Sequence, residues 1–122
     1  MKKLITAFTF ILAITFSAQA QQVKTVALEQ TKGEFTQKEV KLSEGSYVFN
    51  ITNNQAGTDV GFVLVPEGKD VSDAKNHIAA AYVTKVVAEG KTESSKTVKL
   101  EKGTYTYFCP LNKTPQYKLV VE

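Results

Sequence analysis

The residues able to do redox or metal chemistry are scarce, because the chain has one cysteine, Cys109, and one histidine, His77. A hydrolytic triad needs a histidine between a nucleophile and a carboxylate, and here a single histidine on a predicted surface helix would have to serve every role. No glycine-rich phosphate loop leads from a strand into a helix, and no pair of residues has metal-ligand spacing. We therefore predict that the chain is not an enzyme.

Cys109 ends an alternating run that includes Tyr105 and Tyr107. Their shared parity predicts that the three side chains point inward, where a cysteine behaves as a small buried hydrophobe. A reactive thiol would instead need an exposed, electropositive environment, for which Lys113 is the only nearby candidate. His77 is expected on the solvated side of its own segment.

Period-two alternation, typical of half-buried strands, runs through most of the chain. It predicts strands near residues 23–27, 38–42, 46–52, 96–101, 104–109 and 116–122, and a nearly continuous apolar run predicts another at 60–65. Residues 67–94 break the alternation, and apolar spacings of three and four predict a helix near residues 70–89, capped by Asp70 or Ser72. The segment 83–87 is ambiguous, since its β-branched residues also suit a short strand.

Seven to eight short strands with one helical insertion indicate an all-β fold, a Greek-key β-sandwich. The sequence Gly103-Thr104-Tyr105, at the start of the penultimate strand, suits a corner in which the tyrosine hydroxyl bonds the backbone.

The N-terminal residues have the pattern of an export signal. Lys2 and Lys3 precede an uncharged, mostly apolar run that ends at Ala18-Gln19-Ala20, a small-x-small cleavage site. The run is shorter than the roughly 20 apolar residues of a membrane span. We expect a bacterial signal peptide at 1–20, one domain at 21–122, and a monomer without a membrane span in the periplasm or outside the cell.

The charge balance argues against a nucleic-acid partner. The formal charge of +3 includes Lys2 and Lys3, so the rest of the chain carries only +1. The sequence contains no arginine, the residue that normally reads bases and phosphates in a bidentate way.

The C-terminal part resembles the end of a cupredoxin, the family of plastocyanin and azurin. The resemblance is carried by Gly103-Thr104-Tyr105-Thr106-Tyr107-Phe108-Cys109-Pro110, a short loop and the strand 117–121. The strand Val60-Gly61-Phe62-Val63-Leu64, after an Asn-rich loop, is similar to the strand that begins with the first copper histidine. The resemblance spans residues 21–122 and implies a copper site at one end of a sandwich.

In that family a thiolate and two histidines hold the copper, together with a weak axial ligand. The resemblance places the thiolate at Cys109. It places the first histidine at Val60, or at Asp59 if the register shifts by one, and the second near Asn112. One of the three strong ligands is therefore present, and the resemblance implies a degenerate copper site.

The axial position falls near Gln116 or Tyr117, and glutamine serves in some members of the family. If copper is bound at all, the expected metal ligands are Cys109, His77 and Gln116. The first interpretation is a small exported binding or interaction domain that has lost type 1 copper and has no cofactor. Its expected partner is an unknown envelope protein or a small ligand.

The alternative is a periplasmic copper-binding or electron-transfer protein that uses Cys109 with a non-standard ligand set. A third interpretation is a partner of a larger envelope system, such as one for metal uptake.

Overall fold

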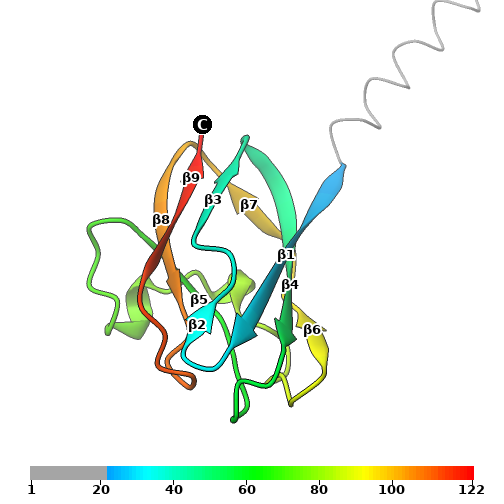
Figure 1. Ribbon diagram of the computed structural model, residues 1–122. Helices are drawn as coiled ribbons and strands as arrows, with labels where there is room; N and C mark the ends of the chain where they lie inside the picture. The colour runs from blue at the N-terminus through cyan, green and yellow to red at the C-terminus, as the bar shows by residue number, and fades with distance from the viewer. Residues whose placement is uncertain (1–21) are drawn as a thin grey trace, which may run out of the picture.

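The computed structural model describes residues 22–122, so the predicted signal peptide at 1–20 lies outside the described residues. Nine strands of this part form two sheets, drawn mainly on the right and mainly on the left of Figure 1. The first sheet contains β1 (Val23–Thr31), β2 (Glu34–Phe35), β4 (Gly45–Asn53), β6 (Thr92–Ser94) and β7 (Val98–Leu100). The second contains, in spatial order, β3 (Glu39–Leu42), β9 (Tyr117–Val121), β8 (Gly103–Phe108) and β5 (Val63–Pro66). The predicted all-β sandwich is confirmed.

The core lies between the two sheets and follows from the alternation of side chains along the strands. In β4, which pairs in parallel with β1, Tyr47, Phe49 and Ile51 are at most 3% exposed. Phe35 lies at the centre of an aromatic cluster: its ring centroid is 5.1 Å from that of Tyr107, with edge-to-face geometry. No helix in the described part is long and apolar enough to cross a membrane.

The predicted tyrosine corner is present at the start of β8. The Tyr105 hydroxyl donates a hydrogen bond to the Glu101 carbonyl oxygen at 2.9 Å. A second bond of this kind is made by the Tyr47 hydroxyl, which donates to the Ser43 carbonyl oxygen at 2.7 Å. Each bond ties the start of a strand to the turn that precedes it.

The helix predicted near residues 70–89 is replaced by two single 3-10 turns, η1 (Ala74–Asn76) and η2 (Ala79–Ala81). The Asp73 side chain caps η1 by accepting from the Lys75 N–H. The chain then leaves the helical conformation, because the Ile78 N–H donates to the Leu64 carbonyl oxygen of β5 at 2.9 Å.

The segment that follows η2 forms isolated β-bridges, neither the helix nor the short strand that the sequence left open for residues 83–87. Val83 forms an isolated antiparallel bridge with Ser95, and Val87 forms another with Val60. These bridges satisfy main-chain groups that a helix would have satisfied internally. Tertiary pairing therefore outweighs the weak helical pattern of a segment rich in β-branched residues.

Candidate functional site

Three loops meet at the lower end of the sandwich in Figure 1 and position the candidate site: the turn from β1 to β2, the loop from β4 to β5 and the loop from β8 to β9. Cys109 follows the last residue of β8, and Asn112 lies in the loop from β8 to β9. Gly61 lies two residues before β5 and next to Val60. The Gly61 nitrogen is 3.2 Å from Cys109 Sγ, so the structure brings together the positions that the resemblance assigned to copper ligands.

Cys109 is a free cysteine and is completely buried. Its Sγ accepts one hydrogen bond from the Gly61 N–H at 3.2 Å and another from the Asn112 N–H at 3.4 Å. Tyr107, two residues earlier, is also 0% exposed, as the shared parity predicted. The sulfur is thus packed in the core and hydrogen-bonded, in the manner of a small buried hydrophobe.

Val60 lies where the resemblance places the first histidine, and it is 0% exposed. Its N–H donates to the Val87 carbonyl oxygen at 3.0 Å, and the Val87 N–H donates back at 2.9 Å. The Asn53 amide supports this bridge by donating to the same Val87 oxygen at 3.0 Å. The Val60 side chain has no atom that could bind a metal.

Asn112, at the place of the second histidine, is only 7% exposed. Its side-chain nitrogen donates to Gln30 Oε1 at 3.1 Å and to the Thr31 carbonyl oxygen at 2.7 Å. Its side-chain oxygen accepts from the Gly33 N–H at 2.9 Å. The carboxamide therefore holds the Cys109 loop against the end of β1 and the turn after it, and both of its heteroatoms are engaged.

Gln30 closes these contacts into a hydrogen-bond ring, defined here as Gln30, Gly61, Cys109 and Asn112. The Gln30 Nε2 donates to the Gly61 carbonyl oxygen at 2.8 Å, and its Oε1 accepts from Asn112. Gly61 and Asn112 in turn each direct a main-chain N–H at the sulfur. Buried polar groups are stable when each has a partner, and this ring supplies one for each.

His77 lies in the segment after β5, where two hydrogen bonds hold its ring. Its Nε2 lies 2.7 Å from the Val71 carbonyl oxygen, and its Nδ1 lies 2.7 Å from the Tyr82 hydroxyl. A carbonyl oxygen only accepts, so Nε2 donates to Val71, while Nδ1 shares its hydrogen bond with the Tyr82 hydroxyl. The ring also packs edge-on against Phe108, with centroids 6.5 Å apart. His77 therefore fastens this segment, whereas the sequence predicted a solvated side chain.

Neither Gln116 nor Tyr117, the two residues near the expected axial position, belongs to the hydrogen-bond ring. Gln116 is exposed to solvent, and the neighbouring Tyr117 ring packs edge-on against Phe35 with centroids 5.6 Å apart. The Tyr117 hydroxyl accepts from the Phe35 N–H at 3.3 Å, which makes it part of the core.

The residues present do not fit a type 1 copper centre. Such a centre needs two imidazole nitrogens beside the thiolate, whereas Val60 and the hydrogen-bonded Asn112 occupy those places. Within residues 22–122, no three His, Cys, Asp or Glu side chains lie close enough together to hold a metal ion. What the arrangement can do is keep the end of the sandwich closed by hydrogen bonds among its own residues.

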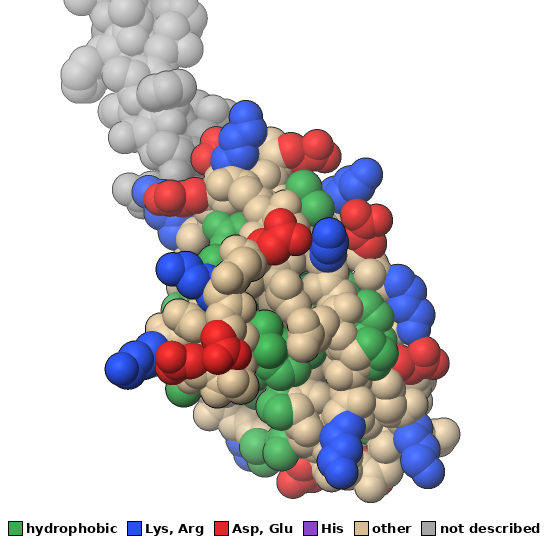
Figure 2. Space-filling model, turned by 90° about the vertical axis from the view of Figure 1, so that its left-hand side faces the viewer, with side chains coloured by type: hydrophobic (Ala, Val, Ile, Leu, Met, Phe, Trp, Pro, Cys, Tyr) green, Lys and Arg blue, Asp and Glu red, His purple; other side chains and the backbone are tan. Residues whose placement is uncertain are grey.

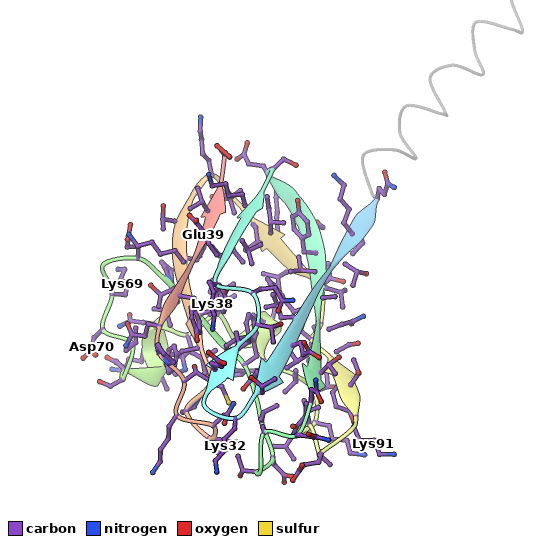
Figure 3. All side chains as sticks on the ribbon, viewed as in Figure 1. Lys32, Lys38, Glu39, Lys69, Asp70 and Lys91 are labelled. Carbon is purple, nitrogen blue, oxygen red and sulfur yellow. The ribbon has the colours of Figure 1, made fainter. Side chains whose placement is uncertain are left out.

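Burial and neighbouring side chains shift the pKa values of Tyr107, Asp70 and Lys38. Burial, followed by the neighbouring Tyr117 and Glu39, raises the pKa of Tyr107 to about 12. Hydrogen bonds from Ser72 lower the pKa of Asp70, and a hydrogen bond to Glu34 raises the pKa of Lys38. Figure 3 shows Asp70 on the loop after β5 and Lys38 just before β3.

Gln30 is the site residue that the sequence interpretation missed. It shares its strand face with Val26 and Leu28, and all three are at most 7% exposed. A glutamine on the inward face of an alternating strand was the available signal, because a buried amide needs a polar partner. Its partner Asn112 lies 82 positions away, so the pairing could not be found from local sequence.

Comparison with known proteins shows where this arrangement belongs. The sequence model of the family described as a cupredoxin-like domain matches residues 4–121. Auracyanin A, a "blue" copper protein from the green thermophilic photosynthetic bacterium Chloroflexus aurantiacus, is 23% identical with a TM-score of 0.68. The alignment covers 83% of this chain and 100% of that one.

Two further solved structures are similar. Auracyanin B is 21% identical with a TM-score of 0.68, covering 81% of this chain and 88% of that one. A dithionite-reduced auracyanin from the photosynthetic bacterium Roseiflexus castenholzii is 18% identical with a TM-score of 0.65, covering 80% and 96%. No curated protein sequence matches the chain. At these identities the solved structures establish the fold.

Proposed function

The chain belongs to the cupredoxin-like domain family, and from this premise we propose that it is an exported binding or interaction domain that has lost type 1 copper binding. The family also confirms the prediction that the chain is not an enzyme. The proposal has two parts, the loss of the metal and the use of the remaining scaffold for binding.

The observation that carries the first part is the hydrogen-bond ring. The carboxamide of Asn112 donates to Gln30 and Thr31 and accepts from Gly33. Its nitrogen is fully used by these bonds, and a carboxamide oxygen is a weaker copper ligand than the imidazole nitrogen that a type 1 centre uses. Val60 cannot contribute a donor atom under any rearrangement of its side chain. Both features favour a site that is complete without a metal ion.

The second part, the use of the scaffold for binding, rests on the expected location of the protein and on the lack of a catalytic group in the hydrogen-bond ring. The export signal predicted at 1–20 supports a place in the periplasm or outside the cell, where an envelope protein or a small ligand would be the partner. With no catalytic group in the ring, surface recognition is the activity that this scaffold can still perform.

Thermal unfolding with and without copper tests the proposal. A metal that binds the native state raises the melting temperature by mass action. We expect the reduced domain and its Cys109→Ala variant to show equal shifts, close to zero, when Cu(I) or Cu(II) is added. A rise of several degrees in the wild type that disappears in Cys109→Ala would contradict the loss of copper.

One observation favours a second candidate, copper handling through Cys109. Two main-chain N–H groups point at its sulfur, and donors in this position are well suited to a thiolate. In this case, Cys109→Ala should weaken the affinity for Cu(I) in a competition titration. An affinity unchanged by that substitution removes this candidate.

A further inference from the structure

An open strand edge runs along the N-terminal part of β1. On one side, β1 pairs with β4 from Val23 to Gln30. On the other side its only strand neighbour is β2, which pairs with Gln30 and Thr31 alone. Residues 23–29 therefore have no strand beside them on that side. Figure 1 shows the N-terminal half of β1 at the margin of the domain.

The hydrogen bonds at the end of β1 show which main-chain groups point out of the sheet. Gln30 faces β4, because its carbonyl oxygen accepts from the Asn54 N–H at 2.8 Å. Glu29 faces the other way: its carbonyl oxygen accepts from the Thr36 N–H at 2.9 Å, and its N–H donates to Gln37 Oε1 at 2.8 Å. Because successive residues of a strand alternate in direction, the odd-numbered residues of β1 point away from β4.

Three of these outward-facing residues remain free, namely Val23, Thr25 and Ala27. Within residues 22–122, no turn or loop donates to their carbonyl oxygens or accepts from their N–H groups. All three side chains are exposed, Val23 by 47%, and none carries a charge. An exposed strand edge with unmade main-chain bonds is a template for pairing with another strand.

The other strand edges of the described part are less available. The edge of β3 carries the exposed charges of Glu39 and Lys41, and charges of this kind oppose pairing. The Ile78 N–H covers β5 by donating to the Leu64 carbonyl oxygen, and β6 and β7 have three residues each. On the side that carries the loop after β5, charged side chains of both signs lie among apolar ones (Figure 2).

We propose that β1 pairs with β1 of a second copy of this chain, antiparallel and across a twofold axis at Thr25. A closed dimer of identical chains is twofold symmetric, which makes the two β1 strands antiparallel. The five-stranded sheet of one copy then continues into that of the other. This inference goes beyond the proposed function and replaces the monomer expected from the sequence.

The free groups and the charges select one register. Thr25 opposite Thr25 of the second copy places Val23 opposite Ala27, so that all three residues exchange both main-chain bonds. A shift by two residues in one direction places Lys24 opposite its own copy, where like charges repel. A shift in the other direction places Val23 opposite Glu29, whose main-chain groups are already bonded.

The side chains suit the same register. The exposed Val23 packs against Ala27 of the second copy, and Lys24 lies opposite the uncharged Val26. One pair of strands buries less than the roughly 1,200 Å² of a stable interface. We therefore expect a reversible dimer with a dissociation constant of roughly 100 μM.

Sedimentation equilibrium of the reduced chain 21–122, from about 10 μM to 1 mM, tests the inference. The average mass should rise with concentration toward that of a dimer. Thr25→Lys and Thr25→Glu should each weaken the dimer by about fivefold at low salt, because each new charge faces its own copy. An equimolar mixture of the two variants should recover the dimer, since opposite charges then meet. Thr58→Lys, at an exposed threonine between β4 and β5, is the matched control and should change nothing.

Amide hydrogen exchange locates the contact. The amides of Thr25 and Ala27 should exchange more slowly as the concentration rises. A chain that stays monomeric at about 1 mM overturns the inference and leaves a foreign strand as the occupant of this edge. The inference also fails if the two Thr25 variants dimerise as well as the wild type, or if their mixture recovers nothing. None of these results bears on the loss of copper, which the copper titrations test.

Discussion

Replacing Asn112 by alanine removes three hydrogen bonds that fasten the Cys109 loop to the end of β1. The lost partners are Gln30 Oε1, the Thr31 carbonyl oxygen and the Gly33 N–H, at 3.1, 2.7 and 2.9 Å. The Gln30 side chain is completely buried, so water does not reach its Oε1 without a local rearrangement. Thr31 and Gly33 are partly exposed and can be solvated in the variant.

The magnitude follows from these exposures. A buried acceptor left without a partner costs about 1–3 kcal/mol, and each of the two partly exposed bonds contributes about 0.5–1.5 kcal/mol. We therefore expect Asn112→Ala to lower the free energy of unfolding by about 3 kcal/mol. This is a large share of the roughly 5–15 kcal/mol typical of a domain.

Urea denaturation followed by circular dichroism measures this loss. With a slope of about 1–3 kcal/mol/M, the midpoint should fall by about 1–3 M. Asn54→Ala is the matched control, because its exposed amide donates only to Glu29 Oε2, and it should cost less than about 0.5 kcal/mol. A double-mutant cycle with Gln30→Ala should give a coupling of about 1 kcal/mol. If Asn112→Ala lowers the free energy of unfolding no more than Asn54→Ala does, or if the effects of Asn112→Ala and Gln30→Ala simply add, the hydrogen-bond ring does not stabilise the Cys109 end of the sandwich.

Three other predictions concern single residues. Tyr107 has a folded-state pKa of about 12, above the unfolded value of about 10. Its contribution to the free energy of unfolding is therefore complete below pH 10 and is lost as the pH rises through 12. The free energy of unfolding should fall by up to about 3 kcal/mol over this range, and Tyr107→Phe should reduce this fall. Cys109 should react with a thiol reagent such as DTNB only as the protein unfolds, and rapid labelling under native conditions would contradict its burial. His77→Ala should speed proteolysis between Glu67 and Tyr82 more than the exposed control Lys75→Ala does, and equal rates would show that His77 does not fasten this segment.

Strand alternation explains why most of the fold could be predicted. In the second sheet, the parity of Tyr105, Tyr107 and Cys109 matches their inward placement. Tyr105 even bonds the preceding turn as its position suggested. These features depend on local periodicity and turn chemistry, which a single sequence contains.

The segment after β5 could not be predicted in the same way. Its apolar spacing suited a helix, but its main chain is paired with distant partners: Ile78 with Leu64, and Val87 with Val60. The role of His77 follows from the same folding, because its two partners, Val71 and Tyr82, approach it only when the segment turns back on itself.

The candidate site was predictable in position but not in its bonding. The resemblance predicted that Val60, Cys109 and Asn112 lie at one end of the sandwich. The hydrogen bonds to Cys109 Sγ from Asn112 and from Gly61, the neighbour of Val60, agree with this placement. The role of Asn112 depends on Gln30, in a strand at the other end of the sequence. A copper ligand set is defined by residue types, whereas a hydrogen-bond ring is defined by contacts between distant segments.

Visible absorption of the reduced domain during titration with Cu(II) tests the central claim most directly. A cysteine thiolate bound to copper together with imidazoles gives the intense visible band of a type 1 centre. With a valine and a hydrogen-bonded carboxamide beside Cys109, the account predicts no such band at any copper concentration. A visible band that saturates with copper and disappears in Cys109→Ala would contradict it.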